Sequence, residues 1–354
     1  MPETFRVGLL GHGTVGSAFA KLLAERADAI VPITGLRPEI TGILTRSRGS
    51  FEEVLEGADL VVELIGGIEP ARDYVLRAMR AGKHVVSANK MLLASYGEEL
   101  WSCAREHAVQ LRFEGAVAGV VPVIRVLQET LAAAHVERIH GIVNGTTNFI
   151  LTEMARGGTT YEAALRRAQE LGLGLKLIGT AERVDGGISV RVHPAFLYAG
   201  HPLASVHGPF NAVTVESEAI TEVTLSGPGA GGPQTATAVL GDVISAMIPP
   251  ASRVGGDEIT ESLPVVNDVE SAFYLHMEVA DRPGVLAQIA ELLGMQGASI
   301  RSVVQKGLGE NARLVLVLHP LLESRFYAAV RLIGQLDFIR SAPRAIRVID
   351  EEFT

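Results

Sequence analysis

Three glycines near the start of the chain have the spacing of a nucleotide-binding turn. They are Gly11, Gly13 and Gly16; they follow an apolar run that ends at Leu10, and an amphipathic helical pattern begins within the motif. In such a turn the first glycine permits a tight bend, the second lets a pyrophosphate approach the backbone, and the third allows close helix packing. The positive end of the helix also favours phosphate. The pattern predicts binding of a dinucleotide, with a structural glycine turn as the alternative.

Two arginines occupy the position that discriminates NAD from NADP in dinucleotide-binding domains. An acidic residue at the end of the second strand would bind the ribose hydroxyls of NAD, but this chain has Arg46 and Arg48 there. A guanidinium group suits the 2′-phosphate of NADP. We therefore expect NADP as the favoured cofactor and Arg46 as the contact. NAD is the alternative, because an arginine near a ribose is also commonly a solvated surface charge.

Lys90 is one of only five lysines in the chain. It follows the predicted strand 84–87, at the carboxyl edge of the sheet, where doubly wound folds bind their ligands. At this place a lysine can hold a substrate carboxylate or transfer a proton. An ordinary exposed lysine is the alternative on position alone.

One carboxylate followed by small residues has the composition of a cation site. Glu114 ends the fifth predicted strand, and small residues with free carbonyls follow it up to Pro122. A carboxylate together with backbone oxygens suits a hard cation. An acid at a strand end can also cap the next helix, and the residue pattern alone favours that second role.

The elements that must position these residues alternate between short apolar runs and helical patterns. Such alternation is typical of βαβ units around a parallel sheet, and nearly continuous apolar strands indicate burial on both faces. We expect a doubly wound α/β domain with strands over 7–10, 41–44, 60–65, 84–87 and 109–113.

The pattern changes in the second half of the chain. A strand is expected over 139–143, and a capping box at Thr159 and Glu162 predicts a helix that ends near Gly172. A helix over 235–247 closes this region. Four further strands between the two helices have the pattern of a β-meander, over 175–184, 188–197, 212–216 and 222–225.

The last part of the chain is separated by a segment with the composition of a linker. Residues 249–268 begin with two prolines and show no usable period. The strands and helices that follow run in the order βαββαβ. The expected organisation is a Rossmann domain over 1–135, a shortened α+β domain over 136–248, a linker over 249–270 and a small domain over 271–354.

Composition and charge exclude several classes of protein. The chain has 354 residues, of which 47% are hydrophobic, and a formal net charge of -9. This composition is typical of a folded protein and lacks the basic footprint of a nucleic-acid binder. No apolar run reaches the roughly 20 residues of a membrane helix. A single cysteine and the absence of a secretory leader predict a cytoplasmic protein. The charge and the short apolar runs predict that it binds neither nucleic acid nor membrane.

Taken together, these motifs resemble those of homoserine dehydrogenases that carry a C-terminal ACT domain. The family interconverts L-aspartate 4-semialdehyde and L-homoserine with NAD(P)H, in the pathway to threonine, methionine and isoleucine. Residues 281–286 resemble the ACT signature, which implies regulation by an amino acid such as threonine. The matching motifs cover essentially the whole chain and lie at 11–16, 63–67, 88–90, 114–122, 144–150, 191–194, 227–232 and 281–286.

The resemblance implies roles for individual residues. It makes Lys90 the catalytic candidate, close to both nicotinamide and substrate. It also implies a monovalent cation such as Na⁺ at Glu114 and at the backbone carbonyls of Val117, Gly119 and Val121, and so favours the cation role of Glu114 over capping. The implied cofactor contacts are Gly11, Gly13, Thr14, Val15, Ile65, Lys90 and Gly229, in addition to Gly16 and Arg46 from the fingerprint.

The chain departs from the family after Gly172. Family members have a long segment there with substrate-binding acids and a catalytic lysine, whereas this chain passes directly into the strand that carries Lys176. Lys176 matches a later strand lysine of the family and not its catalytic one.

This departure leaves three hypotheses. The first is an NADP-preferring homoserine dehydrogenase that acts on homoserine or aspartate semialdehyde and uses Lys90. The second is a catalytically impaired relative that binds nucleotide and amino acid as a regulatory or sensor protein. The third is a product of a deleted or wrongly assembled gene. The family also implies a homodimer formed through the meander strands.

Overall fold

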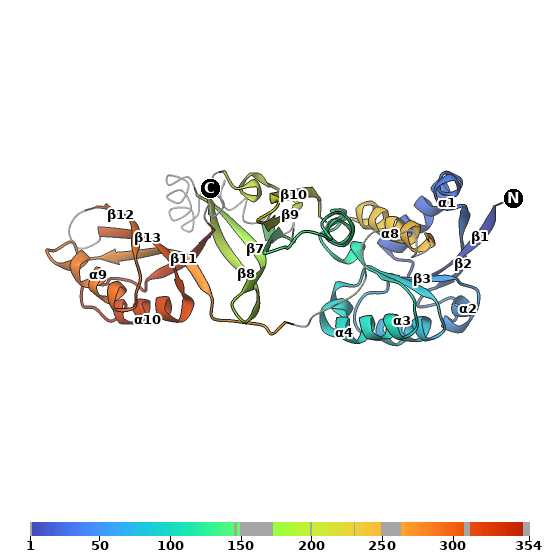
Figure 1. Cartoon of the computed structure of the whole chain (residues 1–354), viewed down its shortest axis with the longest axis horizontal. Coiled ribbons are helices and arrows are strands. Elements are labelled where there is room, and N and C mark those ends of the chain that lie inside the picture. The colour runs from blue at the N-terminus through green and yellow to red at the C-terminus, as the bar shows by residue number, and fades with distance from the viewer. Residues whose placement is uncertain are drawn as a thin grey trace.

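The structure is a computed structural model that describes residues 2–144, 147–148, 173–198, 200–229, 231–248, 263–307 and 312–349. Figure 1 shows three parts in a row, with the N-terminal part at one end and the C-terminal βαββαβ part at the other. Two sequence predictions lie outside the described residues: the capping-box helix that ends near Gly172 and the linker residues up to position 262.

Five parallel strands form the sheet of the N-terminal part, in the order β2-β1-β3-β4-β5. They are β1 (Glu3–Leu10), β2 (Leu36–Leu44), β3 (Leu60–Glu63), β4 (His84–Ser87) and β5 (Leu111–Arg112). The five predicted strands are confirmed, and with them the parallel α/β fold. Because β1 has β2 on one side and β3 on the other, the carboxyl ends of β1 and β3 flank the crevice where such folds bind ligands.

Helices cover both faces of this sheet, as Figure 1 shows. The helices α2 (Phe51–Glu56), α3 (Ala71–Arg80) and α4 (Lys90–Glu106) share one apolar core with the sheet. On the other face lie α1 (Thr14–Thr34) and α8 (Gly232–Met247). None of the helices within the described ranges is long and apolar enough to cross a membrane.

The helix α8 lies in a different part of the molecule from the one that its sequence position predicts. Sequence analysis assigns it to the second domain, 136–248, but its buried side chains pack with those of α1 and β1 in the core of the first. Val239 and Val243, which have no exposed surface, contribute to the same cluster as Phe19. The chain therefore returns from the middle part to complete the nucleotide-binding layer.

The middle part is an antiparallel sheet whose strand order differs from a simple meander. Its strands are β6 (Arg138–Ile142), β7 (Leu173–Val184), β8 (Gly187–Tyr198), β9 (Phe210–Ser217) and β10 (Thr221–Pro228). The order is β10-β9-β6-β7-β8, so β6 separates β7 from β9. Sequence analysis found all five strands, but the hairpin signals gave no information on where the earlier strand would insert.

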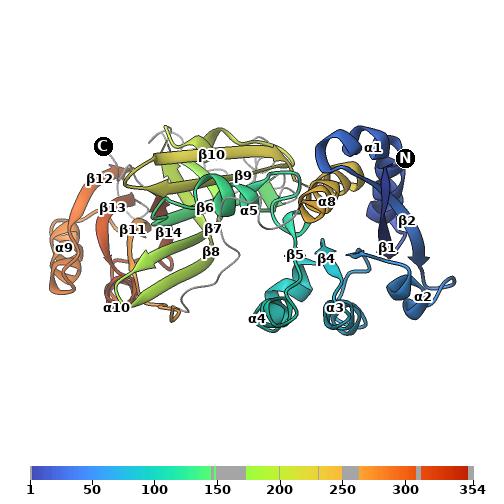
Figure 2. The ribbon, with the colours of Figure 1, turned by 45° about the vertical axis from the view of Figure 1, so that its right-hand side comes forward.

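The C-terminal part has the predicted βαββαβ order. Its elements are β11 (Glu270–Val279), α9 (Val285–Met295), β12 (Ile300–Lys306), β13 (Ala312–Leu322), α10 (Glu323–Ile333) and β14 (Arg344–Ile349). Both helices pack on one side of the sheet, where the rings of Phe273 and Phe326 stack 3.6 Å apart. Figure 2 shows α9 and α10 at this outer end of the molecule.

One strand joins the middle and C-terminal sheets. The last strand, β14, pairs in parallel with β8, so that the two sheets form one of nine strands. The ring of Phe196 on β8 packs against Tyr274 on β11, with centroids 5.0 Å apart. The C-terminal part is therefore built onto the middle sheet through a backbone pairing and an apolar contact.

Candidate nucleotide and substrate site

The three glycines of the N-terminal turn meet three different spatial requirements. Gly11 has a φ of 97°, and a Cβ there would lie 2.6 Å from the carbonyl oxygen of Leu64. A Cβ on Gly16 would lie 2.1 Å from the carbonyl oxygen of Gly11. A Cβ on Gly13, in contrast, would meet no atom within 4 Å. The backbone is thus open only at the second glycine, where the fingerprint requires a pyrophosphate to approach.

The first turn of α1 offers unpaired amide groups beside this opening. Its N-cap residue is Gly13, which has no side chain to accept a hydrogen bond, and no acidic residue lies in the first turn. The amides of Thr14 and Val15 are among those that an α-helix leaves without internal acceptors. These donors and the helix dipole fit a phosphate group, so the residues present fit a dinucleotide.

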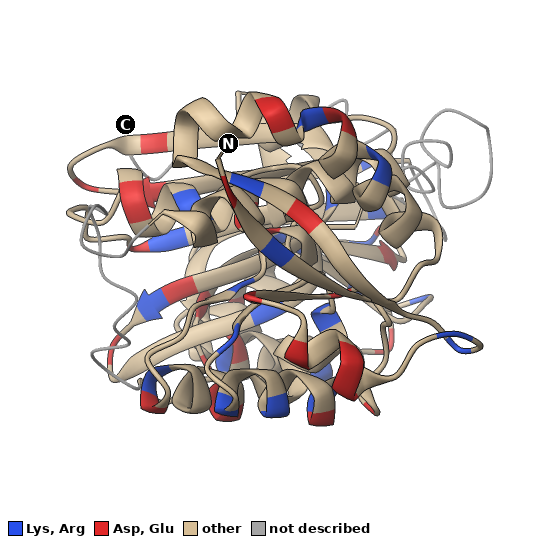
Figure 3. Ribbon diagram, turned by 90° about the vertical axis from the view of Figure 1, so that its right-hand side faces the viewer, with Lys and Arg blue, Asp and Glu red and all other residues tan. Residues whose placement is uncertain are grey.

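Arg46 lies beside the glycine turn. The amide of Gly11 donates to the carbonyl oxygen of Leu44, the last residue of β2, at 2.9 Å, and this bond brings the loop after β2 next to the turn. Arg46 is exposed and has no ion-pair partner among the described residues. Figure 3 looks onto this end of the molecule, and the colours of its ribbon show basic and acidic positions interspersed along the chain. The guanidinium of Arg46 is therefore available to a ligand phosphate.

A buried carboxylate fixes the loop after β3. Glu63 has no exposed surface, and its Oε1 accepts hydrogen bonds from the amides of Ile65 at 2.8 Å and Gly66 at 3.1 Å. Its Oε2 accepts a bond from the hydroxyl of Ser87 at 2.7 Å. The result is a rigid loop in which the side chain of Ile65 remains 38% exposed and faces the ligand crevice.

A second set of hydrogen bonds fixes the backbone next to Lys90. Asn89 donates from its side chain to the carbonyl oxygen of Gly67 at 2.6 Å and accepts from the amide of Leu92 at 3.2 Å, which caps α4. The amide of Asn89 donates to the Ser87 hydroxyl at 3.1 Å. Lys90 is the first residue of α4 and is exposed to the crevice. The loops after β3 and β4 therefore hold one another in place around Lys90.

These groups line one cavity between the N-terminal and middle parts, with a volume of about 610 Å³. Its walls bring together four of the predicted cofactor or catalytic residues, namely Val15, Ile65, Lys90 and Gly229. Gly119, one of the predicted cation ligands, lies on the same wall. Asn144 and Thr147, from the motif 144–150, lie on the side of the middle part.

The loop around Gly119 is pressed against Gly229. Gly119 has a φ of 72°, and a Cβ there would lie 1.8 Å from the carbonyl oxygen of Gly229. Ala118 precedes it with a φ of 53°, an unfavourable conformation for a residue with a Cβ. This close backbone approach brings the loop after β10 to the cavity, as the resemblance implies for Gly229.

The carboxylate of Glu114 caps a helix. Its two oxygens accept hydrogen bonds from the amides of Ile124 and Arg125, each at 2.9 Å, at the start of α5 (Val123–Arg125). Burial raises the pKa of Glu114, and these two bonds partly oppose the shift. The capping role that the residue pattern favours is therefore present. The predicted cation role of Glu114, Val117, Gly119 and Val121 stays a prediction, and no cluster of three or more His, Cys, Asp or Glu side chains suited to a metal occurs among the described residues.

Sequence analysis missed two polar residues next to this site. Asp242 on α8 accepts the amide of Glu114 at 2.7 Å and lies 3.6 Å from the guanidinium of Arg125, and burial raises its pKa to about 7. Asn211 on β9 is buried, lines the cavity and leaves its Oδ1 without a partner among the described residues. A lone acid inside the apolar pattern of 235–247 was the available signal for Asp242. Asn211 carries no comparable signal.

Lys176 lies apart from this cavity. It is buried on β7, where its ammonium donates to the carbonyl oxygen of Val206, and burial lowers its pKa to about 8. Val206 also accepts the side-chain amide of Asn148 at 3.3 Å. Lys176 does not line the cavity. Its assignment as a strand lysine of the family, and not as the catalytic one, stays a prediction.

Comparison with proteins of known function shows which family this chain belongs to. The homoserine dehydrogenase of Corynebacterium glutamicum is 34% identical over 422 aligned positions, which cover 97% of this chain and 95% of that protein. The chain belongs to the homoserine dehydrogenase family. The profile named "Homoserine dehydrogenase, NAD binding domain" matches residues 11–114, and the profile named "Homoserine dehydrogenase" matches residues 122–174 and 172–244.

Solved structures agree with the family. A homoserine dehydrogenase from Thiobacillus denitrificans superposes with a TM-score of 0.89 at 31% identity, covering 98% of this chain and 99% of that one. A hyperthermophilic archaeal homoserine dehydrogenase mutant in complex with NADPH has a TM-score of 0.57 at 26% identity, covering 69% and 97%.

Homoserine dehydrogenases are NAD(P)-dependent oxidoreductases that interconvert L-aspartate 4-semialdehyde and L-homoserine, and this chain is one by family. Its relatives are named as enzymes and match nearly its whole length. The comparisons therefore do not favour the hypothesis of a sensor protein.

Proposed function

We propose that this homoserine dehydrogenase uses NADP(H) and that Lys90 is its catalytic residue. The observation that carries the proposal is the position of Lys90 in one cavity with Val15 of the glycine turn and with Ile65. A cation at the start of a helix opposes the helix dipole by roughly 0.3 to 1 kcal/mol, so Lys90 does not serve the stability of α4. A role toward a ligand explains its presence.

The chain's own groups divide the work in the following way. The bound dinucleotide supplies or accepts the hydride. Lys90 gives a proton to the carbonyl oxygen of the semialdehyde as the alcohol forms, and takes it back in the reverse direction. Asn89 and Ser87 hold the helix start from which Lys90 projects, so the backbone of Lys90 is fixed before the substrate binds.

The test is steady-state reduction of NADP⁺ by L-homoserine with the wild type, Lys90→Ala and Lys90→Arg. We expect kcat of Lys90→Ala to fall by roughly 10²- to 10⁴-fold, with Lys90→Arg in between because it keeps the charge but not a transferable proton. Circular dichroism checks that both variants fold. An unchanged kcat in Lys90→Ala would remove Lys90 from the mechanism.

NADP(H) is proposed as the cofactor because Arg46 is exposed beside the glycine turn and forms no ion pair with any described residue. The NADPH complex of the archaeal relative agrees with this choice. NAD is the alternative cofactor of the same site, and the kcat/KM values for the two cofactors decide between them.

A monovalent cation such as Na⁺ is proposed at Glu114, Val117, Gly119 and Val121. The support is the conformation of Ala118 and Gly119, whose positive φ angles turn successive peptide groups of this loop. The Glu114 carboxylate already binds two amides, so the backbone carbonyls would supply most of the ligands. Equal activity in sodium and in tetramethylammonium chloride would contradict this proposal.

We also propose that this chain lacks the central segment of the family. The support is that the alignment with the Corynebacterium enzyme runs over 422 positions, more than the 354 residues of this chain. In addition, the family profile matches in two pieces that meet at residues 172–174. Resequencing the locus tests the proposal, and an additional coding segment at this junction would show that the natural enzyme is longer.

Two further proposals concern regulation and assembly. The C-terminal βαββαβ part is proposed to be an ACT domain that binds an amino-acid effector at the loop 281–286, supported by its strand order β14-β11-β13-β12 and a small cavity of 150 Å³ at this loop. Absence of any effect of threonine on the rate would count against this ACT proposal.

The enzyme is also proposed to be a homodimer. A monomeric sedimentation coefficient would count against that proposal.

A further inference from the structure

Two walls of the catalytic cavity begin directly after two neighbouring strands end. Glu63 is the last residue of β3 and Ser87 the last of β4, and the parallel register pairs them. The residues that follow each of them, 64–66 and 88–90, line the cavity. Glu63 and Ser87 have 0% and 1% exposed surface and are not part of this lining. A contact between their side chains can therefore set both walls from behind.

The carboxylate of Glu63 uses its two oxygens for different loops. Oε1 accepts hydrogen bonds from the amides of Ile65 at 2.8 Å and Gly66 at 3.1 Å. Oε2 accepts a bond from the hydroxyl of Ser87 at 2.7 Å, and the Ser87 oxygen accepts the amide hydrogen of Asn89 at 3.1 Å. One oxygen thus holds the loop after β3, and the other holds, through Ser87, the start of α4.

The first turn of α4 depends on such bonds, because the helix is interrupted. Tyr96 has a φ of -135° and a ψ of 19°, which are not helical, so the turn that begins with Lys90 is not continuous with the longer helix behind it. Leu92 anchors this turn in the apolar core, and its amide donates to Asn89 at 3.2 Å. The side chain of Asn89 donates in turn to the carbonyl oxygen of Gly67, in the loop after β3. The position of the turn is therefore tied to that loop.

Stability alone does not explain a carboxyl group at this place. A buried carboxyl group costs free energy, and hydrogen bonds offset only part of that cost when no cation pairs with it. No cationic side chain of the described residues forms an ion pair with Glu63. An acid that is costly to bury and that bonds to two walls of one cavity has the properties of a group that serves the reaction.

We infer that Glu63 is a positioning residue of the dehydrogenase. One of its oxygens sets the loop of Ile65, and the other sets, through Ser87, the turn from which Lys90 extends. The inference rests on the proposed function, in which Lys90 transfers the proton and Ile65 faces the cofactor. Because the two oxygens serve different loops, the effects on cofactor binding and on proton transfer can be separated by substitution.

Hydrogen–deuterium exchange of the full chain, followed by mass spectrometry, tests the structural step without turnover. Ser87→Ala removes only the branch to α4, so the amides of 89–93 should exchange at least about tenfold faster while those of 64–67 keep wild-type rates. Glu63→Ala removes both branches and should accelerate exchange in both segments. Thr34→Val is the control, because the Thr34 hydroxyl also joins two segments, the end of α1 and the start of β2, at the opposite edge of the sheet. It should change neither segment.

Steady-state reduction of NADP⁺ by L-homoserine tests the catalytic step, with calorimetric titration for the Kd of NADP⁺. Ser87→Ala should lower kcat by about 10- to 100-fold and leave this Kd within about twofold. Glu63→Ala should also raise the Kd by about tenfold, and Glu63→Gln should restore it, because glutamine keeps an acceptor oxygen for the two amides. In a Lys90→Ala background Ser87→Ala should change kcat by less than about twofold, since it acts through Lys90.

The outcomes separate this inference from the proposed function. An unchanged kcat in Lys90→Ala contradicts the proposed function, and the exchange rates then still decide whether Glu63 holds the two loops. An impaired Lys90→Ala beside a Ser87→Ala variant with wild-type kcat overturns the inference. Wild-type exchange of both segments in Glu63→Ala overturns it as well, with or without turnover. If Glu63→Ala does not fold, Ser87→Ala carries the test.

Discussion

At the scale of single residues, the glycine turn and Arg46 determine how the cofactor is held. Gly13 leaves its side-chain position open, whereas Gly11 and Gly16 are enclosed by backbone atoms. The same turn is tied to the end of β2 by the hydrogen bond from Gly11 to Leu44. Arg46 therefore lies close to a ligand bound at the turn, and no described residue forms an ion pair with it.

Replacement of Arg46 by Ala is expected to change the cofactor preference. Loss of a charged hydrogen bond to the 2′-phosphate should raise KM for NADP⁺ by about 10- to 100-fold and leave KM for NAD⁺ within about twofold. The measurement is kcat/KM for both cofactors in the wild type and in Arg46→Ala. Arg37→Ala, at an arginine of β2 that is paired with Asp28, serves as control. An equal loss with both cofactors would mean that Arg46 does not read the phosphate.

At the scale of elements, α8 holds the nucleotide-binding layer and the loop of Glu114 together. Its apolar side packs with α1, and its only acid, Asp242, accepts the Glu114 amide and lies beside Arg125. Glu114 in turn caps α5. One buried polar group thus connects three segments that are far apart in the sequence.

Replacement of Asp242 by Ala is expected to lower the free energy of unfolding by about 1 to 3 kcal/mol, because the Glu114 amide loses its buried acceptor. Asp242→Asn keeps an acceptor and should recover most of this loss. Asp28→Ala, in an ion pair whose acid is 88% exposed, should change the stability by less than about 0.5 kcal/mol. Urea unfolding at pH 7 measures all three, and an equal effect of Asp242→Ala and Asp28→Ala would refute the role of Asp242.

The elements were largely predictable from the sequence, but their neighbours were not. Apolar runs and helical periods identify every strand from β1 to β14, since these signals are local. The insertion of β6 between β7 and β9, the return of α8 and the pairing of β14 with β8 depend on which surfaces meet after the chain folds. The same holds for the site: local motifs pointed to Gly11 and Lys90, and the family resemblance pointed to Gly229. Asn211, in contrast, comes from a strand that reaches the cavity only in the folded protein.

At the scale of the whole molecule, the middle sheet has one face that the described chain does not cover. Val143, Val190 and Val192 are 49%, 56% and 70% exposed, and the pairing of Gly141 with Gly179 and of Gly179 with Val192 places them on one face. Exposed apolar side chains gathered on a sheet face are typical of protein interfaces. A second copy of the chain is the partner that the proposed homodimer supplies.

Val192→Glu is therefore expected to weaken the dimer, because a buried charge without a partner is unfavourable in an interface. Sedimentation velocity should show the wild type as a dimer and the variant dissociating at a protein concentration at least about tenfold higher. Val303→Glu, at a valine of β12 that is 43% exposed, is the control with the same chemical change. A variant that remains a dimer to the same dilution as the wild type would exclude this face from the interface.

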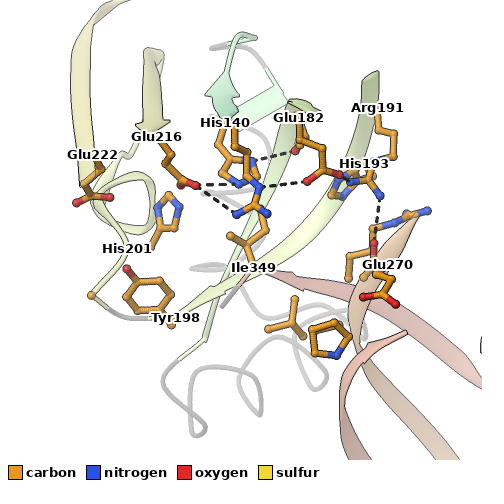
Figure 4. A pocket seen from close by; sticks show the side chains of 18 of the residues that line it. His140, Glu182, Arg191, His193, Tyr198, His201, Glu216, Glu222, Glu270 and Ile349 are labelled. Atoms are coloured by element: carbon orange, nitrogen blue, oxygen red, sulfur yellow. Dashed lines mark hydrogen bonds and ion pairs between the residues drawn. The ribbon is translucent and has the colours of Figure 1, made fainter. Parts of the chain in front are cut away.

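Three buried histidines on the opposite face of the middle sheet make the stability of the whole molecule sensitive to acid. Burial is the largest cause that lowers the pKa of His140 to about 2 and those of His193 and His201 to about 4, from 6.5. Below pH 6.5 these histidines, which line the pocket in Figure 4, therefore bind protons in the unfolded chain but stay neutral in the folded chain. The stability that the neutral histidines contribute is fully present above pH 6.5 and is lost as the pH falls toward 4.

Each histidine is expected to add about 1.4 kcal/mol per pH unit to the slope of the unfolding free energy in this window. Asp242 acts in the opposite direction, because its pKa of about 7 lets the folded chain bind a proton that the unfolded chain binds only near 3.8. The net slope should thus correspond to fewer than three protons between pH 6 and 5, because burial also raises the pKa of Glu114. Urea unfolding across this range should show His201→Asn with a slope lower by about one proton, whereas His135→Asn, at an exposed histidine, should keep the wild-type slope. Parallel slopes for wild type and His201→Asn would mean that burial does not keep His201 neutral in the folded protein.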